Sequence, residues 1–343
     1  MNHSPMISII VPIYNVEQYL QRSISSMMNQ TMKENIEFVF IEDCSTDNSF
    51  EVLQNQLQLY PERQECCVVY RFDKNRGVSA ARNKGIEISH GEWIAFADPD
   101  DELTTDFAEH LSSLVTEDVD LVYAGYDEIS IDGGIKKGSD CKDIKIYNRR
   151  DGLKEILMPS NGYSEAYIWN KLYRKTVIIE NNLKFVEKQI LSQDRPFTID
   201  FICHSKRDKI IHSSIPIYNY YRRGNSSTAE KKFYAKKRLS QLDAYIQTRN
   251  ILKKYYGNDL ELMDIGNGKI YMVFGITNNL MTNYKVYDPI FDFKQLTLVR
   301  KSTELSFLSR KFCSLVFIVM RRYLIACIPA KLKTFIRKYI FIH

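Results

Sequence analysis

Strand-like and helix-like patterns alternate four times within the first hundred residues, which restricts the fold more than any other feature of the sequence. Short apolar runs of this kind are typical of buried parallel strands, and they cover Ile7–Pro12, Ile36–Ile41, Val68–Arg71 and Trp93–Ala97. Helical periodicity predicts helices over Val16–Met28 and Val78–Ser89, with another ending near Leu59. Polar residues follow the carboxyl end of each strand. We therefore predict a doubly wound α/β fold, with a mostly parallel sheet and a ligand crevice at the strand carboxyl ends.

The remaining sequence predicts further strands and then a helical region. After Leu103 we expect a helix, a strand over Asp120–Gly125, an exposed hairpin near Asp132–Gly138, a returning strand over Ile168–Tyr173, a helix beginning at Gln193–Phe197 and two short strands within Lys209–Tyr221. Helical patterns follow over Phe233–Tyr255 and Met263–Tyr284. A chain of 343 residues is longer than a single hydrophobic core usually accommodates. We therefore expect a catalytic domain over residues 1–228 and a helical C-terminal region over 229–343.

Positive charge is concentrated at the C-terminal end of the chain. The net charge is +5, to which residues 300–343 contribute +9 and residues 1–299 contribute −4. Arg321 and Arg322 interrupt the apolar stretch there, so no run reaches the roughly 20 residues that a spanning helix needs. We expect this tail to lie on an anionic membrane surface, with a partner-binding helix or dimer interface as the alternative. A nucleic-acid partner is not expected, because the tail is too apolar.

The cysteine, histidine and N-terminal patterns exclude several classes of protein. The seven cysteines form no C-x-x-C pair, and the six histidines lie far apart. Reduced thiols are therefore expected, and neither a disulfide framework nor a zinc site is. The N-terminus has no basic region, and polar residues soon interrupt its apolar run from Met6 to Ile13, so we do not expect a signal peptide. We expect a cytoplasmic protein, peripheral on the inner face of the plasma membrane.

An acidic cluster follows the fourth predicted strand. Asp98, Asp100 and Asp101 lie within four positions, with Pro99 between the first two. Like charges this close repel unless a proton or a cation shares the site. Mg²⁺ and Mn²⁺ suit such a site, because they are held by one or two carboxylates and keep other positions for water and phosphate. The alternative is a solvated acidic turn that caps a helix.

The loops after the first two strands offer groups that suit a nucleotide. Tyr14 can stack on a nucleobase, since every base has a π-face; the alternative is a tyrosine that covers the sheet edge. Asp43 can accept the ring N–H of uracil, or it can serve a turn or helix cap together with Ser45 and Thr46. A G-x-G-x-x-G motif is missing after the first strand, which disfavours NAD. Arg82 suits a diphosphate, because guanidinium groups pair bidentately with phosphate.

Four motifs, in this order and spacing, resemble the successive blocks of family-two glycosyltransferases with the GT-A fold. They are Pro12-Ile13-Tyr14-Asn15, Glu42-Asp43-Cys44-Ser45-Thr46-Asp47, Asn75-Arg76-Gly77-Val78-Ser79-Ala80-Ala81-Arg82-Asn83 and Asp98-Pro99-Asp100-Asp101. Each motif alone is weak, but together they cover residues 6–105. The likeness continues less closely through Trp169–Tyr173, Gln193-Asp194 and Tyr218–Ser227, and it ends near residue 230.

The resemblance implies roles in donor binding for five residues. Tyr14 and Asp43 would hold the base, and Pro12 would shape that loop. Asp98 would bond the ribose or the sugar. Arg82 would lie near the diphosphate or the donor sugar.

The resemblance also implies a metal site and a general base. Asp100 would be the direct metal ligand, with Asp101 supporting the site beside it. Asp194 would be the base; the family has a Glu-Asp pair where this chain has Gln193-Asp194, which puts a second carboxylate role in doubt. The alternatives for Asp194 are a helix N-cap or a partner of Arg195. Arg222, in a segment that resembles the family's lid, would reach phosphate, and a plain exposed loop is the alternative.

The resemblance, together with the basic tail, implies an inverting, metal-dependent glycosyltransferase of the type that makes bacterial surface polysaccharides. A UDP-sugar would be the donor, a saccharide or lipid-linked saccharide the acceptor, and Mn²⁺ or Mg²⁺ the cofactor. A sugar nucleotidylyltransferase is one alternative, although it would need a glycine-rich loop after the first strand. A noncatalytic GT-A scaffold is the other.

Overall fold

The computed structural model describes residues 7–130, 133–136, 143–159, 166–187, 189, 191–222 and 231–267. The chain divides into two compact units between Glu230 and Lys231. In the second unit, α8 covers Lys231–Tyr256 and helical structure resumes at residues 260–267. The basic tail over residues 300–343, and most of the helix expected over Met263–Tyr284, lie outside the described residues. Within the described part of the chain, no helix combines the length and apolarity that crossing a membrane requires.

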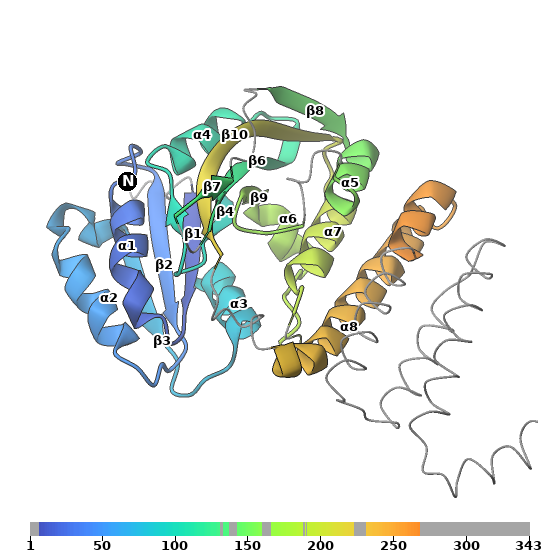
Figure 1. Cartoon of the computed structure of the whole chain (residues 1–343). Helices are drawn as coiled ribbons and strands as arrows, with labels where there is room; N and C mark the ends of the chain where they lie inside the picture. The colour runs from blue at the N-terminus through green and yellow to red at the C-terminus, as the bar shows by residue number, and fades with distance from the viewer. Residues whose placement is uncertain are drawn as a thin grey trace, which may run out of the picture. The chain divides into compact units, whose positions relative to one another are not determined.

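The first unit is built on one mixed sheet, visible edge-on in Figure 1. Its order is β3-β2-β1-β4-β9-β6-β10-β5, with β7 beside β6 and β8 beside β10. The strands are β1 Ile7–Ile13, β2 Ile36–Glu42, β3 Cys67–Arg71, β4 Trp93–Phe96, β5 Glu102–Leu103, β6 Val119–Ile129, β7 Ile135–Lys136, β8 Ile144–Asn148, β9 Lys171–Arg174 and β10 Lys209–Tyr221. Neighbours β3, β2, β1 and β4 are parallel. The antiparallel β9 separates β4 from β6, and β6 is parallel to β10. All the long strands therefore run in one direction, which confirms the predicted mostly parallel α/β sheet.

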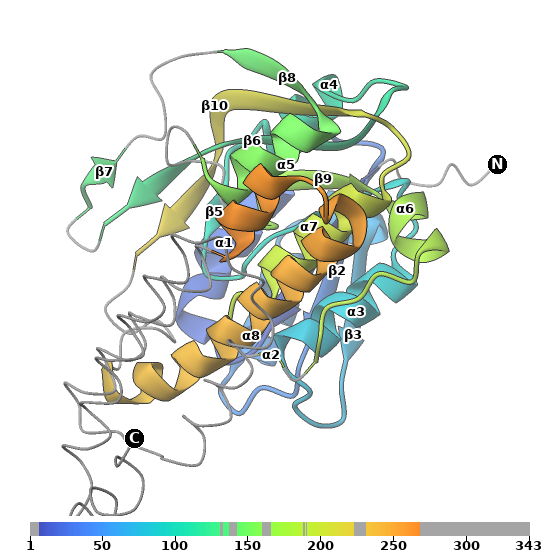
Figure 2. The ribbon, with the colours of Figure 1, turned by 90° about the vertical axis from the view of Figure 1, so that its right-hand side faces the viewer.

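Helices cover both faces of this sheet, as Figures 1 and 2 show. They are α1 Glu17–Met28, α2 Ser49–Gln58, the 3₁₀ helix η1 Pro61–Cys66, α3 Val78–Ile88, α4 Phe107–Ser113, α5 Arg149–Leu157, α6 Lys175–Glu180 and α7 Asp194–His204. Alternate residues of a strand point to opposite faces. Ile9 accordingly packs in one core with Leu20 of α1 and Phe107 of α4, whereas Ile10 faces Gly85 of α3. This two-sided burial explains the continuous apolar runs of the central strands.

Two local predictions were wrong. Lys209–Tyr221 forms one bulged strand instead of two, with register shifts on both sides of Pro216, which has no N–H to donate to a ladder. The expected cap of the second helix by Ser45 or Thr46 is not found, because α2 begins at Ser49 and its N-cap residue is Asn48. The Ser45 hydroxyl instead accepts the Asn15 N–H at 3.2 Å and joins the first two strand-end loops. Only residues 133–136 of the expected hairpin are described, and β7 there pairs with β6.

Helix α3 approaches the sheet closely at Gly85, where a Cβ would lie 2.3 Å from the Ile10 Cγ2. We expect Gly85→Ala to lower the free energy of unfolding by about 1–3 kcal/mol, the usual cost of overpacking a core. Urea titration measures this loss. Ile10→Ala removes the clashing methyl, so the double variant should lose less than the two single losses combined. Strict additivity would contradict the predicted contact.

Candidate functional site

The acidic cluster lies in a tight turn directly after β4. Ala97 still donates its N–H to the Ile10 carbonyl at 3.0 Å, and the Asp101 N–H then turns back to the Asp98 carbonyl at 3.2 Å. One ligand atom from each of Asp98, Asp100 and Asp101 lies within 4.8 Å of the others. Asp98 and Asp100 are partly exposed, whereas Asp101 is buried. The sequence prediction that these three carboxylates converge is met by this geometry.

Strand β10 holds the acidic cluster from the side through Asp101. The Tyr218 hydroxyl donates to Asp101 Oδ2 at 3.0 Å and accepts the Asp98 N–H at 3.1 Å. The Tyr221 N–H donates to Asp101 Oδ1 at 2.9 Å. Burial, and next the charges of Asp101 and Asp98, raise the pKa of Tyr218, so its hydroxyl keeps the proton that it donates. Asp101 therefore fastens β10 to the turn, and its two oxygens both accept protein hydrogen bonds.

The donor set of this cluster fits a hard divalent cation. Its ligand atoms are carboxylate oxygens, which Mg²⁺ and Mn²⁺ prefer over sulfur or imidazole ligands. Asp98 and Asp100 are both partly exposed, as an ion that keeps several outer ligands requires. The Arg22 guanidinium of α1 donates to the Asp100 backbone carbonyl at 3.0 Å, which ties this helix to the acidic turn.

Arg82 joins the acidic cluster to Asp194, which lies 112 residues further along the chain. Its guanidinium donates to Asp98 Oδ1 at 3.2 Å and to Asp194 Oδ1 at 2.8 Å. The arginine side chain is only 6% exposed, while that of Asp194 is 21% exposed. Arg82 was predicted to lie near a diphosphate; in this structure its charge is shared between two carboxylates.

Asp194 is the first residue of α7, and its carboxylate combines burial with a strong ion pair. Burial raises the pKa of this carboxyl, and the nearby Asp98 raises it further, while Arg82 and Lys171 act in the opposite direction. The net effect is a raised pKa, the property that a general base near neutral pH needs. Gln193, where the resembling family has an acid, is almost buried at the start of this helix.

Asp43 directly follows β2 and organises the start of α3. Its carboxylate accepts the Arg76 N–H at 2.6 Å, the Gly77 N–H at 2.7 Å and the Asn75 side-chain amide at 3.1 Å. Burial raises the pKa of Asp43, and the two backbone hydrogen bonds oppose that rise. Gly77 has a φ of +87°, which only glycine adopts readily. Asp43 therefore fixes this loop, in addition to any contact with a base.

The first strand-end loop presents an exposed aromatic ring. Pro12 is buried within β1, opposite Ile41 of β2. Tyr14 follows with a 43% exposed side chain. Asn15 takes a left-handed φ of 51°, and its side chain accepts the Thr46 N–H at 2.8 Å. The loops after β1 and β2 are thus locked together, and the Tyr14 ring remains open to solvent.

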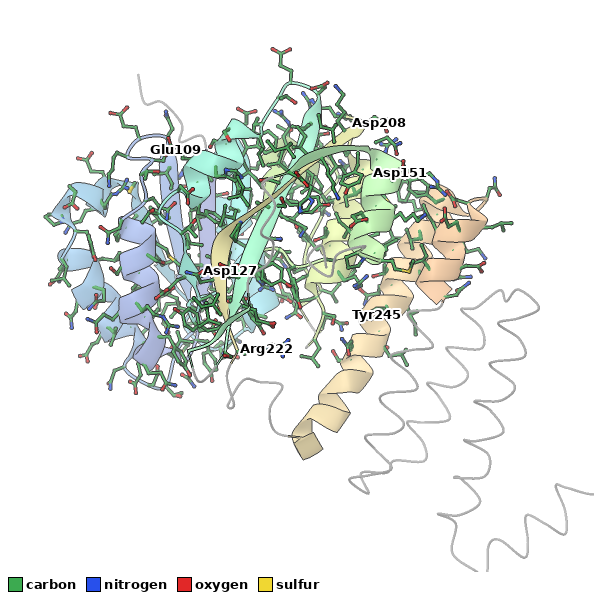
Figure 3. All side chains as sticks on the ribbon, turned by 45° about the horizontal axis from the view of Figure 1, so that its top comes forward. Glu109, Asp127, Asp151, Asp208, Arg222 and Tyr245 are labelled. Carbon is green, nitrogen blue, oxygen red and sulfur yellow. The ribbon has the colours of Figure 1, made fainter. Side chains whose placement is uncertain are left out.

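Arg222 lies just beyond β10, near Asp127 of β6 (Figure 3). Its guanidinium pairs with Glu128 and is 64% exposed. Its N–H donates to the Ile129 carbonyl at 2.8 Å. The proposed lid beyond it, residues 223–228, lies outside the described residues.

Sequence reasoning missed the part of β10 that completes the site. Tyr218 was assigned to a lid segment, but it is fully buried and bonds the acidic turn. The segment is rich in β-branched and aromatic residues, from Ile215 and Ile217 to Tyr218, which is typical of a strand. The segment was predicted to form two short strands. The contact of Tyr218 with Asp101 was not predicted, because the two residues are 117 positions apart.

Comparisons with a family model and with related proteins all identify glycosyltransferases. The family model described as glycosyl transferase family 2 matches residues 8–180. EpsH of Bacillus subtilis (strain 168), which carries the name glycosyltransferase, is 29% identical over 258 residues, or 74% of this chain and 72% of its own length. The poly(ribitol-phosphate) beta-N-acetylglucosaminyltransferase TarP of Staphylococcus aureus (strain N315) is 30% identical over 221 residues, covering 63% of this chain and 62% of TarP.

Solved structures share the fold at lower identity. S. aureus TarS 1–349 superposes with a TM-score of 0.65 at 17% identity, covering 87% of this chain and 81% of TarS 1–349. TarS 1–349 in complex with UDP-GlcNAc gives a TM-score of 0.55 at 17% identity, covering 86% of this chain and 88% of that one. A mannosyltransferase from Pyrobaculum calidifontis, solved with GDP-Man and Mn²⁺, gives a TM-score of 0.54 at 13% identity, covering 91% of this chain and 84% of its own. These likenesses confirm the predicted GT-A type of α/β fold.

Proposed function

Because the chain belongs to glycosyl transferase family 2, we propose that this glycosyltransferase moves a sugar from a UDP-sugar to a hydroxyl of a saccharide or lipid-linked saccharide, with inversion at the anomeric carbon. The observation that carries the proposal is the double contact of Arg82 with Asp98 and Asp194. It brings a carboxylate of raised pKa next to the acidic cluster. A base and a site for a diphosphate are the two elements that a single displacement requires.

In this proposal, the loops after β1 and β2 bind the nucleotide. The exposed Tyr14 ring stacks on the base. Asp43, whose carboxylate is held in place by the Arg76 N–H, contacts the edge of the base, and Pro12 shapes the loop that carries Tyr14. Asp98 hydrogen-bonds the ribose or sugar beside the acidic turn. Relatives support the donor class: TarS is solved with UDP-GlcNAc, and TarP is named as an N-acetylglucosaminyltransferase.

Asp194 then accepts the proton of the attacking hydroxyl. Its carboxylate oxygen that does not bind Arg82 is the acceptor, and the Arg82 guanidinium keeps the side chain oriented. Proton removal by a positioned base contributes about 10²–10⁴-fold to the rate. The oxygen forms its new bond to the anomeric carbon as the bond to the diphosphate breaks on the opposite face, so an α-linked donor gives a β-linked product.

Asp100, supported by Asp101, would hold the Mn²⁺ or Mg²⁺ ion beside the leaving diphosphate. Such an ion, when bound, offsets the charge that grows on the leaving group by several kcal/mol. The Mn²⁺ in the mannosyltransferase of the same fold supports this choice. Arg222, at the end of β10, is proposed to contact phosphate after it leaves Glu128.

The direct test is to incubate the protein with Mn²⁺ and separate UDP-sugars and to measure UDP release. We expect release with one donor of the panel and none with the others at equal concentration. The same assay with EDTA should give no release. If no nucleotide sugar is turned over, the proposed function is wrong.

The pH profile of transfer tests the coupling of Arg82 to the base. The base must be ionised, so the rate should fall as the pH drops through the pKa of Asp194. Since Arg82 lowers that pKa, Arg82→Gln should raise it and move the acidic limb of log kcat to higher pH. Arg82→Lys should move it less, because the positive charge is kept. An acidic limb unchanged in Arg82→Gln would contradict the assignment of Asp194.

We further propose that residues 300–343 dock the enzyme peripherally on an anionic membrane surface, on the cytoplasmic side. The support is the net charge of +9 combined with apolar runs too short to span. The variant Arg321→Glu/Arg322→Glu/Lys331→Glu/Lys333→Glu should no longer sediment with phosphatidylglycerol liposomes. Retained sedimentation would contradict membrane docking. The control is the parent protein with phosphatidylcholine liposomes, which carry no net charge and should not sediment it.

A further inference from the structure

Five aromatic side chains form one stack beside the acidic cluster. Trp169, in the segment before β9, lies at the centre. Its ring is stacked on Tyr218 at 4.3 Å, on Tyr167 at 4.9 Å and, with an offset, on Tyr220 at 5.8 Å between centroids. Tyr126 of β6 meets Trp169 edge-on at 4.7 Å. We call these residues the aromatic stack.

The stack has a buried centre and two partly open members. Trp169, Tyr218 and Tyr126 belong to the buried core. Tyr167 and Tyr220 are only partly buried, and both pack against that core. Offset and edge-to-face ring pairs are each favourable beyond their buried area. The buried rings therefore hold the rings of these two partly exposed residues in fixed positions.

Hydrogen bonds tie the stack to the acidic cluster. Tyr218 bonds both Asp101 and Asp98, as described above. The peptide that joins Tyr220 to Tyr221 donates its N–H to Asp101 at 2.9 Å. A molecule lying on the Tyr220 ring would thus sit next to the carboxylates where the donor's diphosphate is proposed to bind.

The strand order places the stack away from the nucleotide loops. Tyr14 and Asp43 follow β1 and β2, on one side of β4 in the sheet. The stack comes from β6, β10 and the segment before β9, on the other side of β4. The acidic turn after β4 lies between them. The nucleotide and a ligand of the stack can therefore be bound together, with the reacting groups meeting at the turn.

We propose that Tyr167 and Tyr220 form a subsite for a pyranose ring of the acceptor saccharide. This proposal rests on the proposed function, since it assigns the second substrate of the same reaction. A pyranose ring presents C–H groups on a face and hydroxyls at its rim. The face matches a fixed aromatic ring, and the rim hydroxyls can bond the phenol groups and nearby carboxylates. A polyol-phosphate chain, which has no ring, lacks that match.

The chain offers a built-in reporter for this subsite. It contains two tryptophans, Trp93 in the core of β4 and Trp169 in the stack. Trp93→Phe keeps an aromatic ring in the core and leaves Trp169 as the single tryptophan. We would titrate this variant with methyl glycosides of glucose, galactose, mannose and N-acetylglucosamine, with their β-linked disaccharides, and with poly(ribitol phosphate). The parent protein repeats each titration.

We expect the fluorescence emission of Trp169 to change in a saturable way with at least one saccharide. Poly(ribitol phosphate) should leave the emission unchanged. Tyr220→Leu or Tyr167→Leu should weaken that binding at least about threefold, whereas Tyr220→Phe should keep it. Tyr70→Leu, which removes an exposed aromatic ring on the distant edge strand β3, is the matched control and should bind like the parent. If no saccharide changes the emission, or if the two leucine variants bind like the parent, the subsite is wrong.

Turnover separates this proposal from the function on which it rests. In Tyr220→Leu, the acceptor KM should rise while the donor KM and the acceptor-independent release of UDP stay at parent values. If the acceptor KM, the donor KM and the acceptor-independent release of UDP all worsen by the same factor, the ring only supports the acidic cluster. That result would overturn the subsite. If the parent releases no UDP from any donor, the proposed function fails, and the emission titration still decides whether saccharide binds the stack.

Discussion

Asp194→Asn is expected to lower kcat for sugar transfer by about 10²–10⁴-fold, the contribution of a positioned general base. Asparagine keeps the shape of the side chain, and its carbonyl can still accept the Arg82 hydrogen bond that Asp194 accepts at 2.8 Å. It cannot take the proton of the attacking hydroxyl. The acceptor KM should therefore stay close to that of the parent, and the loss should be in kcat.

Steady-state transfer assays measure this effect, and calorimetric titration with UDP and Mn²⁺ checks that the donor site is intact. Asp200→Asn is the matched control, since Asp200 lies on the same helix and pairs with His204 on its surface. It should transfer sugar at the parent rate. If Asp194→Asn also transfers at the parent rate, Asp194 is a structural partner of Arg82 and another group is the base.

Asp100→Ala is expected to weaken UDP binding in the presence of Mn²⁺ by about 100-fold or more, because the ion that Asp100 is proposed to hold would contribute several kcal/mol at the diphosphate. The substitution removes a partly exposed carboxylate, so the fold should be unaffected. In EDTA, the parent and the variant should bind UDP with equal, weak affinity.

Calorimetry with and without Mn²⁺ gives this comparison directly. Asp73→Ala removes an exposed carboxylate from the loop after β3, outside the acidic cluster, and should leave the Mn²⁺-dependent affinity unchanged. A variant at Asp100 that still gains affinity from Mn²⁺ would show that the ion is held elsewhere.

The parts of this site that depend on local sequence could be predicted. A strand of apolar residues that ends in polar ones places those residues at one edge of a parallel sheet. This rule put the loops of Tyr14 and Asp43 beside the acidic turn. The convergence of Asp98, Asp100 and Asp101 follows from their spacing alone, since a single turn holds all three.

The contacts that depend on distant segments could not be predicted. Arg82 and Asp194 are 112 residues apart, and only the folded sheet brings α3 and the start of α7 together. The sequence suggested only a diphosphate partner for Arg82, which stays a prediction, because a guanidinium suits both phosphate and carboxylate groups. Tyr218 was missed for the same reason, because its partner Asp101 lies in the turn after β4, far away in the sequence. The sequence alone does not reveal which hydrogen bond a tyrosine makes.

The position of a manganese ion in crystals grown with UDP and MnCl₂ tests the central claim most directly. Anomalous diffraction locates the metal independently of any protein ligand. We predict one strong anomalous peak bonded to the Asp100 carboxylate and to phosphate oxygens of UDP, with the uracil between Tyr14 and Asp43. A manganese peak bound away from Asp98, Asp100 and Asp101, with UDP ordered elsewhere, would contradict the account.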